Sequence, residues 1–143
     1  MELVLLICGF FTGSLLFYLN HRFVAHGPLG RLPILRYMKR MHLKHHRYDY
    51  TENRNEHLLL PWWGKFLFFL TFLFIAVFSL FFALGIISYV VYYEWMHYKI
   101  HNEYRDSKCG KHHYIHHRKS PKHNFSGTMP FIDKIFGTYI KSS

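Results

Sequence analysis

Ten of the 13 His side chains fall in four short clusters whose spacings suit metal binding. Residues i, i+3 and i+4 share one face of an α-helix, so an H-x2-H-H pattern directs three imidazoles toward one point and an H-x3-H pattern directs two. An H-x4-H pair lies about 140° apart on an ideal helix, so it requires the helix to end or bend, and Gly27-Pro28 provides such an end. The clusters are His21 and His26 (H-x4-H), His42, His45 and His46 (H-x2-H-H), His97 and His101 (H-x3-H), and His113, His116 and His117 (H-x2-H-H).

Imidazole is a ligand for iron, zinc, copper and nickel. Ten imidazoles exceed the coordination number of one ion, so the pattern predicts a site with two metal ions. The clusters contain no carboxylate, so the metal charge must be offset by oxide, hydroxide or a carboxylate behind the ligands. Glu94 is the best candidate, because it lies three residues before His97 and seven before His101 on the same helical face. Asp49, Glu103 and Asp106 are weaker candidates.

The remaining histidines have simpler interpretations. His57 and His123 are predicted to be solvated loop residues, and His112 either supports the metal ligands from behind or has a structural role. Cys109 and His112 form a C-x2-H pair, which leaves zinc binding at this point as a weaker alternative. One H-x2-H-H cluster arises readily by chance on a basic helix, but two such clusters with two further pairs favour a metal site. The two Cys are too few for a disulfide scaffold.

Two long apolar segments predict membrane helices. The mean hydropathy of −0.03 is close to that of a soluble protein, but it averages apolar segments with basic, His-rich ones. Residues 3–19 and 66–93 contain no charged residue, and runs of this length are typical of transmembrane helices. For residues 1–19 the alternatives are a buried helix of a soluble protein and a cleaved signal peptide. The second is disfavoured because no basic segment precedes the apolar run.

The second apolar segment is predicted to be a hairpin. A single helix over its 28 residues would be about 42 Å long, which exceeds the hydrocarbon thickness of about 30 Å. All 18 Lys and Arg lie in residues 20–65 and 96–143, so the positive-inside rule places both basic segments in the cytoplasm. We therefore expect three membrane helices at about residues 2–20, 60–82 and 86–102, with a turn near Ala83-Leu84-Gly85. Trp62, Trp63 and Trp95 suit the membrane interface.

The fold class expected is an all-α integral membrane protein, with one span, one hairpin and a cytoplasmic His-rich helical cap. Residues 1–143 form a single domain whose cap comprises residues 21–59 and 103–143. The cap is expected to contain a helix over 33–47 beginning at Pro33, a turn at Cys109-Gly110 and a short helix over 111–118. Residues 124–140 are expected to lie along the membrane surface. The basic residues flank membrane spans, so we assign them to topology and headgroup contacts, and not to nucleic acid.

The four clusters in order resemble a known family. The segments HRFVAH (21–26), HLKHH (42–46), HYKIH (97–101) and HYIHH (113–117) resemble the fatty acid hydroxylase and sterol desaturase superfamily. The segments YEWMHYKIH (93–101) and NFSGTMPFIDKIFGTYI (124–140) are similar to the fatty acid (sphingolipid) 2-hydroxylase branch. The resemblance covers about residues 18–140, and the ordered set of four clusters is far more specific than any one of them.

The resemblance implies an O2-dependent membrane enzyme with two iron ions that hydroxylates a fatty acyl chain; zinc can occupy such sites in preparations. It makes all ten clustered histidines metal ligands. Desaturases, sterol oxidases and carotenoid hydroxylases of the same superfamily are the alternatives, although the second cluster of carotenoid hydroxylases follows the first much sooner. Outside this class, a His-rich membrane protein that only binds or transports metal, or an inactive partner subunit, remains open.

Two departures from the family pattern matter. Members usually have two spans before the first cluster, whereas one is predicted here. No cytochrome b5-like domain is fused to these residues, so we expect a separate electron-transfer protein, cytochrome b5-like or ferredoxin-like. The other expected partner is a membrane lipid substrate. The expected location is the endoplasmic reticulum or a bacterial inner membrane, with the active site on the cytoplasmic side.

Overall fold

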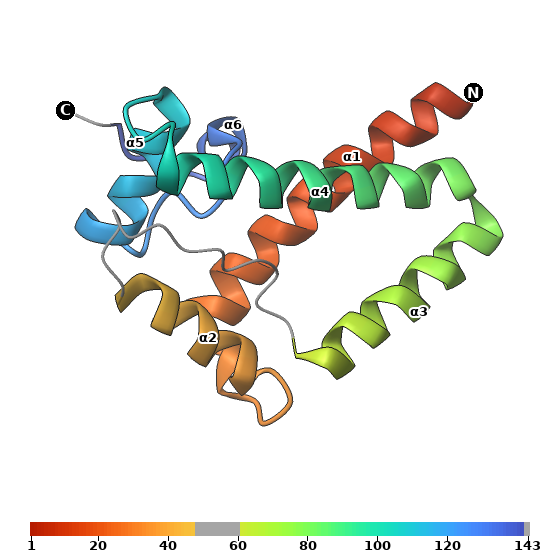
Figure 1. Ribbon diagram of the computed structural model, residues 1–143, viewed down its shortest axis with the longest axis horizontal. Helices are drawn as coiled ribbons and strands as arrows, with labels where there is room; N and C mark the ends of the chain where they lie inside the picture. Colours follow the sequence, from red (N-terminus) through yellow and green to blue (C-terminus); the bar gives the residue numbers. More distant parts are fainter. Residues whose placement is uncertain (48–60, 142–143) are drawn as a thin grey trace.

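A computed structural model describes residues 1–47 and 61–141, and the regular structure within these residues is entirely helical. The shorter helices gather at the left of the molecule in Figure 1; two of the three long apolar helices run from the right across to them, and the third lies at the lower right. The elements are α1 (Glu2–Leu19), a π-helix (Asn20–Ala25), a 3-10 turn (Leu29–Arg31), α2 (Arg36–Arg47), α3 (Trp62–Phe78), α4 (Leu80–Asn102), α5 (Lys108–Tyr114), a second π-helix (Ile115–Lys119) and α6 (Pro130–Ile135). The all-helical class is thus confirmed.

Small residues allow α1 and α4 to pack closely. A Cβ atom on Gly9 would lie 2.1 Å from the Phe82 carbonyl oxygen of α4, and one on Gly85 would lie 2.2 Å from the Leu6 carbonyl oxygen of α1. Helices in an apolar solvent associate through such contacts, because burial of apolar area gives them no driving force. The pairing brings the end of α4 beside the end of α1, where the first and third histidine clusters lie.

The break between α3 and α4 is at Ser79, so the turn predicted at Ala83-Leu84-Gly85 is wrong. Ser79 has an extended conformation (φ −159°, ψ 101°), and its hydroxyl caps α4 by accepting a hydrogen bond from the Phe82 N–H. Gly85 lies inside α4, because its missing side chain serves the contact with α1. Serine is a good N-cap, a signal hidden here by the apolar residues around it.

By length and hydropathy, two helices suit a membrane span: α1 with its π extension, Glu2–Ala25, and α4, Leu80–Asn102. The third apolar helix, α3, has 17 residues and is shorter. Its Phe66, Phe69, Phe74 and Phe78 side chains are all more than half exposed, as expected of a lipid-facing surface. That α3 forms one arm of a membrane hairpin remains a prediction.

Two expected boundaries in the cap differ from the structure. Helix α2 begins at Arg36, and Pro33 lies in the turn before it. Cys109 and Gly110 lie inside α5, which starts at Lys108 because the Ser107 hydroxyl caps it by accepting from the Gly110 N–H. The predicted helix over 111–118 is therefore two elements, and the turn lies before Ser107.

The C-terminal tail, residues 120–141, packs against the C-terminal end of α1. Its Phe125 and Ile132 form a buried apolar cluster with Tyr18, and Asp133 has no exposed surface. On the outer side of α6, Phe131 and Ile135 are exposed. The tail is therefore part of the protein core, and contact of its outer face with a membrane remains a prediction.

Candidate metal centre

The structure brings all ten predicted histidines together at one end of the α1–α4 pair, in two groups of five. Within each group the ligand nitrogens lie within 4.8 Å of one another. Group A comprises His21, His26, His42, His46 and His116. Group B comprises His45, His97, His101, His113 and His117.

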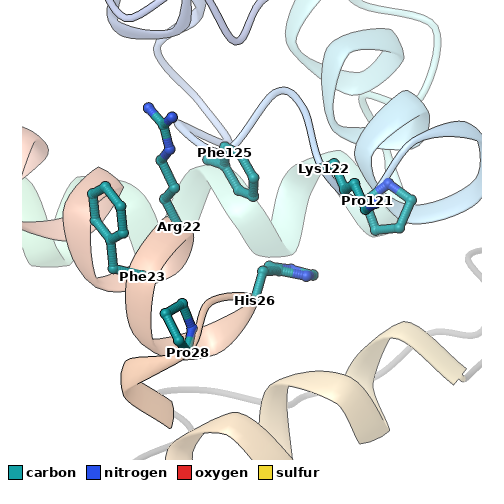
Figure 2. A pocket seen from close by; sticks show the side chains of 7 residues that line it. All are labelled: Arg22, Phe23, His26, Pro28, Pro121, Lys122 and Phe125. Atoms are coloured by element: carbon teal, nitrogen blue, oxygen red, sulfur yellow. The ribbon is translucent and has the colours of Figure 1, made fainter.

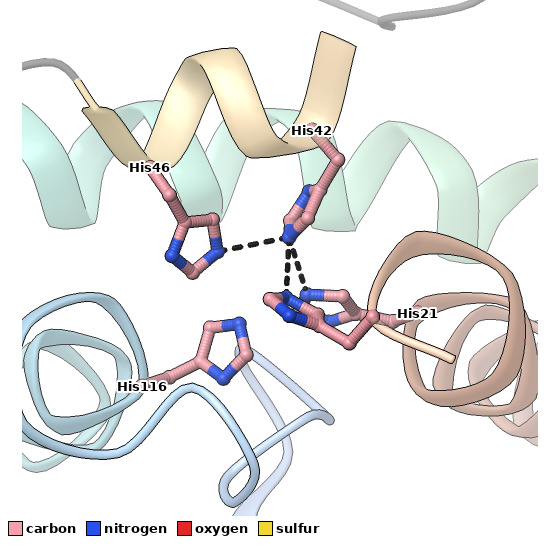
Figure 3. A group of neighbouring side chains, drawn as sticks. His21, His42, His46 and His116 are labelled. Atoms are coloured by element: carbon pink, nitrogen blue, oxygen red, sulfur yellow. Dashed lines mark hydrogen bonds between the residues drawn. The ribbon is translucent and has the colours of Figure 1, made fainter. Parts of the chain in front are cut away.

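Group A converges on the Nε2 atom of His42 (Figure 3). This atom lies 3.0 Å from Nε2 of His21, 2.7 Å from that of His26 and 2.9 Å from that of His46. A ring nitrogen carries one hydrogen or one lone pair, so these three contacts cannot all be hydrogen bonds. Nitrogens bound at right angles to one metal at about 2.1 Å would be about 3 Å apart. The spacing therefore fits a metal ion at the centre of the group.

Group B has a similar centre at His101. Its Nε2 atom lies 3.2 Å from Nε2 of His97 and 3.1 Å from Nε2 of His113. The rings of His45 and His117 approach the His101 ring edge-on, with centroids 4.9 and 5.0 Å away. Nitrogens again face nitrogens at separations that suit coordination to one ion.

Each H-x2-H-H cluster divides between the two groups, so the prediction that it directs three rings to one point is wrong. On α2, His42 and His46 join group A while His45 joins group B. The reason is helical geometry: residues i and i+4 are about 40° apart, whereas i+3 and i+4 are about 100° apart. The rings of His46 and His117 stack at 4.1 Å across the boundary. Two adjacent centres are therefore built from shared helices.

Two π-helical turns position histidines of both groups. The His26 N–H donates to the His21 carbonyl at 3.0 Å, an i to i+5 hydrogen bond. The wider turn brings the H-x4-H pair onto one face, a feature common at functional sites. The expected helix end at Gly27-Pro28 comes just after it. In the second π-helix the Ser120 N–H donates to the Ile115 carbonyl at 2.8 Å, and His116 and His117 lie within that turn.

Two carbonyl groups of the C-terminal tail accept hydrogen bonds from group A rings. The Nδ1 atom of His21 is 2.5 Å from the Phe125 carbonyl oxygen, and Nδ1 of His116 is 2.7 Å from the His123 carbonyl oxygen. A carbonyl only accepts, so Nδ1 carries the proton in both rings and Nε2 presents a lone pair. Histidines that bind metals are commonly held in this way. The Nε2 atom of His116 is buried and makes no hydrogen bond within the described residues, as expected of an atom that binds a metal ion.

Burial keeps the imidazoles neutral, which is the form that binds metal. It lowers the pKa of His26 to about 4, with a further contribution from the Lys39 charge. In the same way burial, together with the neighbouring histidines, lowers the pKa of His46 to about 2. For His116, burial and then His26 lower the pKa to about 3. In group B, burial followed by neighbouring rings lowers the pKa of both His113 and His117.

A sequence model of the family described as fatty acid hydroxylase matches residues 6–138. The chain belongs to this family. Searches among curated proteins and among solved structures give no match. Members of the fatty acid hydroxylase family are oxidoreductases of the lipid hydroxylase or desaturase type, and the family and the two apolar helices together indicate a membrane protein.

The carboxylates expected beside the histidine groups have different surroundings. Glu94 is partly exposed on α4, and its role behind His97 remains a prediction. Glu103 is exposed and bonds Lys99 at 2.6 Å, and Asp106 is exposed. Asp49 and His57 lie outside the described residues.

Sequence reasoning missed Asp133, the one fully buried carboxylate among the described residues. It accepts a hydrogen bond from Nε2 of His112 at 3.0 Å, so His112 supports the tail and is not in either group. Cys109 instead approaches the Thr128 carbonyl oxygen, so the C-x2-H pair does not form a site. His123 lies in a loop as expected, but it is half-buried beside the Ser120 hydroxyl and not solvated as predicted. Asp133 is the only acidic residue of segment 124–140, a signal that could have identified it.

A pocket of about 400 Å³ opens beside group A (Figure 2). It is lined by Arg22, Phe23, His26, Pro28, Pro121, Lys122 and Phe125. His26 belongs to group A, so the pocket reaches one of the candidate ligands. Arg22 is held in place by a 2.8 Å hydrogen bond to the Tyr18 hydroxyl. The pocket therefore combines two cationic side chains with aromatic and proline surface.

Proposed function

We propose that this protein is an O2-dependent lipid hydroxylase that acts on a fatty acyl chain and uses two iron ions, one held by group A and one by group B. The observation that carries the proposal is the sorting of ten histidines into two groups of five, with neutral rings at nitrogen separations near 3 Å. Bound iron would supply the redox chemistry that activates O2. Five imidazoles leave one position for another ligand on an ion that takes six.

The protein's own residues would orient the ligands and keep water away. Phe17 packs on Tyr93 with ring centroids 3.9 Å apart, and Tyr93 stacks on His97 at 5.3 Å and 14°. This aromatic column runs from the α1–α4 interface to group B. It fixes the His97 ring and presents an apolar surface where an acyl chain would approach from the bilayer.

We assign the pocket beside His26 to the polar end of the substrate. Arg22 and Lys122 line it, and both suit a carboxylate or phosphate oxygen. An acyl chain anchored there would expose carbons near its head to group A. This arrangement, with the resemblance of segments 93–101 and 124–140, favours the 2-hydroxylase branch.

The proposal includes a separate electron-transfer protein and a cytoplasmic site. Arg36, Arg40, Lys44 and Arg47 are exposed on α2, beside the helical face that carries the group ligands. An acidic donor would be attracted to this surface. The cytoplasmic side follows from the same basic residues through the positive-inside rule.

The decisive experiment is expression in a lipid-producing host, followed by mass spectrometry of extracted lipids. We expect acyl chains that have gained one oxygen atom at a single carbon. His45→Ala and His116→Ala should abolish the product, since each removes one ring from a group. His123→Ala is the matched control, because that side chain lies outside both groups and its backbone carbonyl is retained.

Other products would change the proposal in defined ways. Acyl chains that have lost two hydrogens would identify a desaturase, and oxygenated sterols or carotenoids would identify those branches. Unchanged lipids with iron-loaded, membrane-inserted protein and a suitable electron donor would contradict enzymatic function and favour a metal-binding protein.

A further inference from the structure

The carboxylate of Asp133 is surrounded by hydrogen-bond donors although it is outside both histidine groups. It has no exposed surface, and it accepts from the Phe125 N–H at 2.8 Å and the Ser126 N–H at 2.9 Å. Side chains of Ser126, His112 and Thr138 also donate to it. Burial raises its pKa, but these bonds together lower the pKa below its usual value. Asp133 is therefore a buried anion at the centre of the tail.

One peptide group connects this anion to group A. The Ser126 N–H and the Phe125 C=O belong to the same planar peptide unit, and no cis peptide bond occurs within residues 1–47 and 61–141. In a trans peptide these two groups point in opposite directions. The N–H donates to Asp133, and the C=O accepts from Nδ1 of His21 at 2.5 Å. The peptide therefore links the carboxylate to a candidate metal ligand.

The backbone on either side holds this peptide in place. Asn124 and Gly127 both have positive φ, 58° and 66°. The Asn124 side chain donates to the His112 and Ile140 carbonyls and accepts from the Ile140 N–H. Asn and Gly are the residues that tolerate this conformation. The orientation of the Phe125 carbonyl is thus fixed from both sides.

We propose that Asp133 is a positioning residue for the group A metal ion and acts through the Phe125–Ser126 peptide on His21. In many metal sites a carboxylate bonds the ligating histidine directly; here a peptide lies between them. The carboxylate polarises the peptide, since hydrogen bonds in a chain strengthen one another. The more basic carbonyl holds the proton on Nδ1 and leaves Nε2 for the metal.

The same tail segment also supplies the His123 carbonyl, which accepts a hydrogen bond from His116. The carbonyls of Phe125 and His123 therefore both support rings of group A. Loss of the Asp133 charge should therefore weaken the group A ion selectively. The inference rests on the proposed two-metal function. The two are separable, because wild-type protein that binds fewer than two ions contradicts the function itself.

The test is the Asp133→Asn variant, purified in detergent and titrated with Zn²⁺, with bound metal counted by elemental analysis. We expect two ions per chain for wild type. Asn offers a single acceptor oxygen where two backbone N–H groups need one each. We therefore expect a 10- to 100-fold weaker affinity at one site, the range found when such supports are removed, and unchanged affinity at the other. Glu103→Gln, an exposed carboxylate, is the matched control.

A spectroscopic readout separates positioning from general stability. With ¹⁵N-labelled histidine, the NMR spectrum of the metal-free wild type should show His21 protonated on Nδ1, and Asp133→Asn should shift the population toward Nε2. Proton placement on Nε2 in the wild type would overturn the proposal, as would full occupancy of both sites in the variant.

If the Asp133→Asn variant does not fold, two milder variants test the same role of Asp133. Thr138→Val and Ser126→Ala each remove a side-chain bond to Asp133 and leave both backbone bonds in place. Each should weaken the same single site, by less than tenfold, at unchanged helix content. Equal weakening of both sites, or of neither, would contradict a role confined to group A.

Discussion

Groups A and B have the same composition but are assembled differently. Group B takes three of its rings from α4 and α5, which follow each other in the chain, and four of its five histidines are buried. Group A joins His21 and His26, at the end of α1, to His116 near the C-terminus, and three of its five are partly exposed. It also borders the pocket. Group A thus depends on long-range contacts and is the more accessible centre, whereas group B is the more enclosed one.

The largest expected effect comes from removing the central ring of each group. His42→Ala should lose the group A ion and keep the group B ion, and His101→Ala should do the reverse. Each variant should bind about one metal per chain, compared with two in wild type, and form no detectable product. Metal analysis with lipid mass spectrometry measures both outcomes. Loss of both ions in both variants would mean that the groups form one inseparable site.

Removal of the metal ions should destabilise the fold strongly, and the two groups should lose their ions in separate steps. An ion present at 1,000 times its dissociation constant stabilises the folded state by about 4 kcal/mol. We expect a chelator to lower the melting temperature in two steps, with the group A ion released first because its ligands are more exposed. His42→Ala should abolish the first step and serve as the control. A single step in wild type would contradict the difference between the groups.

Acid should destabilise the metal-free protein through histidines of both groups, because burial lowers the pKa of rings in each. The pKa of His26 is lowered to about 4 and that of His116 to about 3, whereas the unfolded chain protonates near 6.5. Below pH 6.5 the unfolded state binds more protons than the folded state, so the free energy of unfolding decreases as the pH decreases. The loss should accumulate from pH 6.5 down to about 4 for His26. Chemical unfolding of wild type and His26→Asn across this range should show a shallower slope in the variant.

The smallest effect is expected at the rim of the pocket. Lys122 is exposed, and an exposed charge contributes about 1 kcal/mol or less. Lys122→Ala should raise KM for an anionic lipid several-fold and leave kcat unchanged, with Lys141→Ala as the control on the same tail. A change in kcat alone would place the lysine outside substrate binding.

Much of this site could be predicted from spacing alone. Eight of the ten candidate histidines were identified because i, i+3 and i+4 relations are local properties of a helix, and the H-x4-H pair His21 and His26 completed the set; the structure brings all ten into a group. Their division into two groups was not predicted, because it depends on how α2, α4 and α5 face one another. The π turn at His21 was missed for a related reason: π-turns have no reliable sequence signal.

The fold was predicted less completely. Hydropathy identified α1, α3 and α4, but the break at Ser79 lies inside an uninterrupted apolar run and was placed four to six residues too late. Gly85 was interpreted as a turn residue, whereas it serves close helix packing. Asp133 could have been noticed as the only acidic residue of segment 124–140, but its role could not be assigned because its partners, Phe125, Ser126 and His112, lie 7 to 21 residues away. Local pattern carries no information on such contacts.

The most direct test of two adjacent metal centres is anomalous diffraction at the iron absorption edge from crystals of the iron-loaded protein. We expect two separate iron peaks, one among the Nε2 atoms of group A and one among the ligand nitrogens of group B. A single peak shared by both groups, or iron outside them, would contradict the central claim.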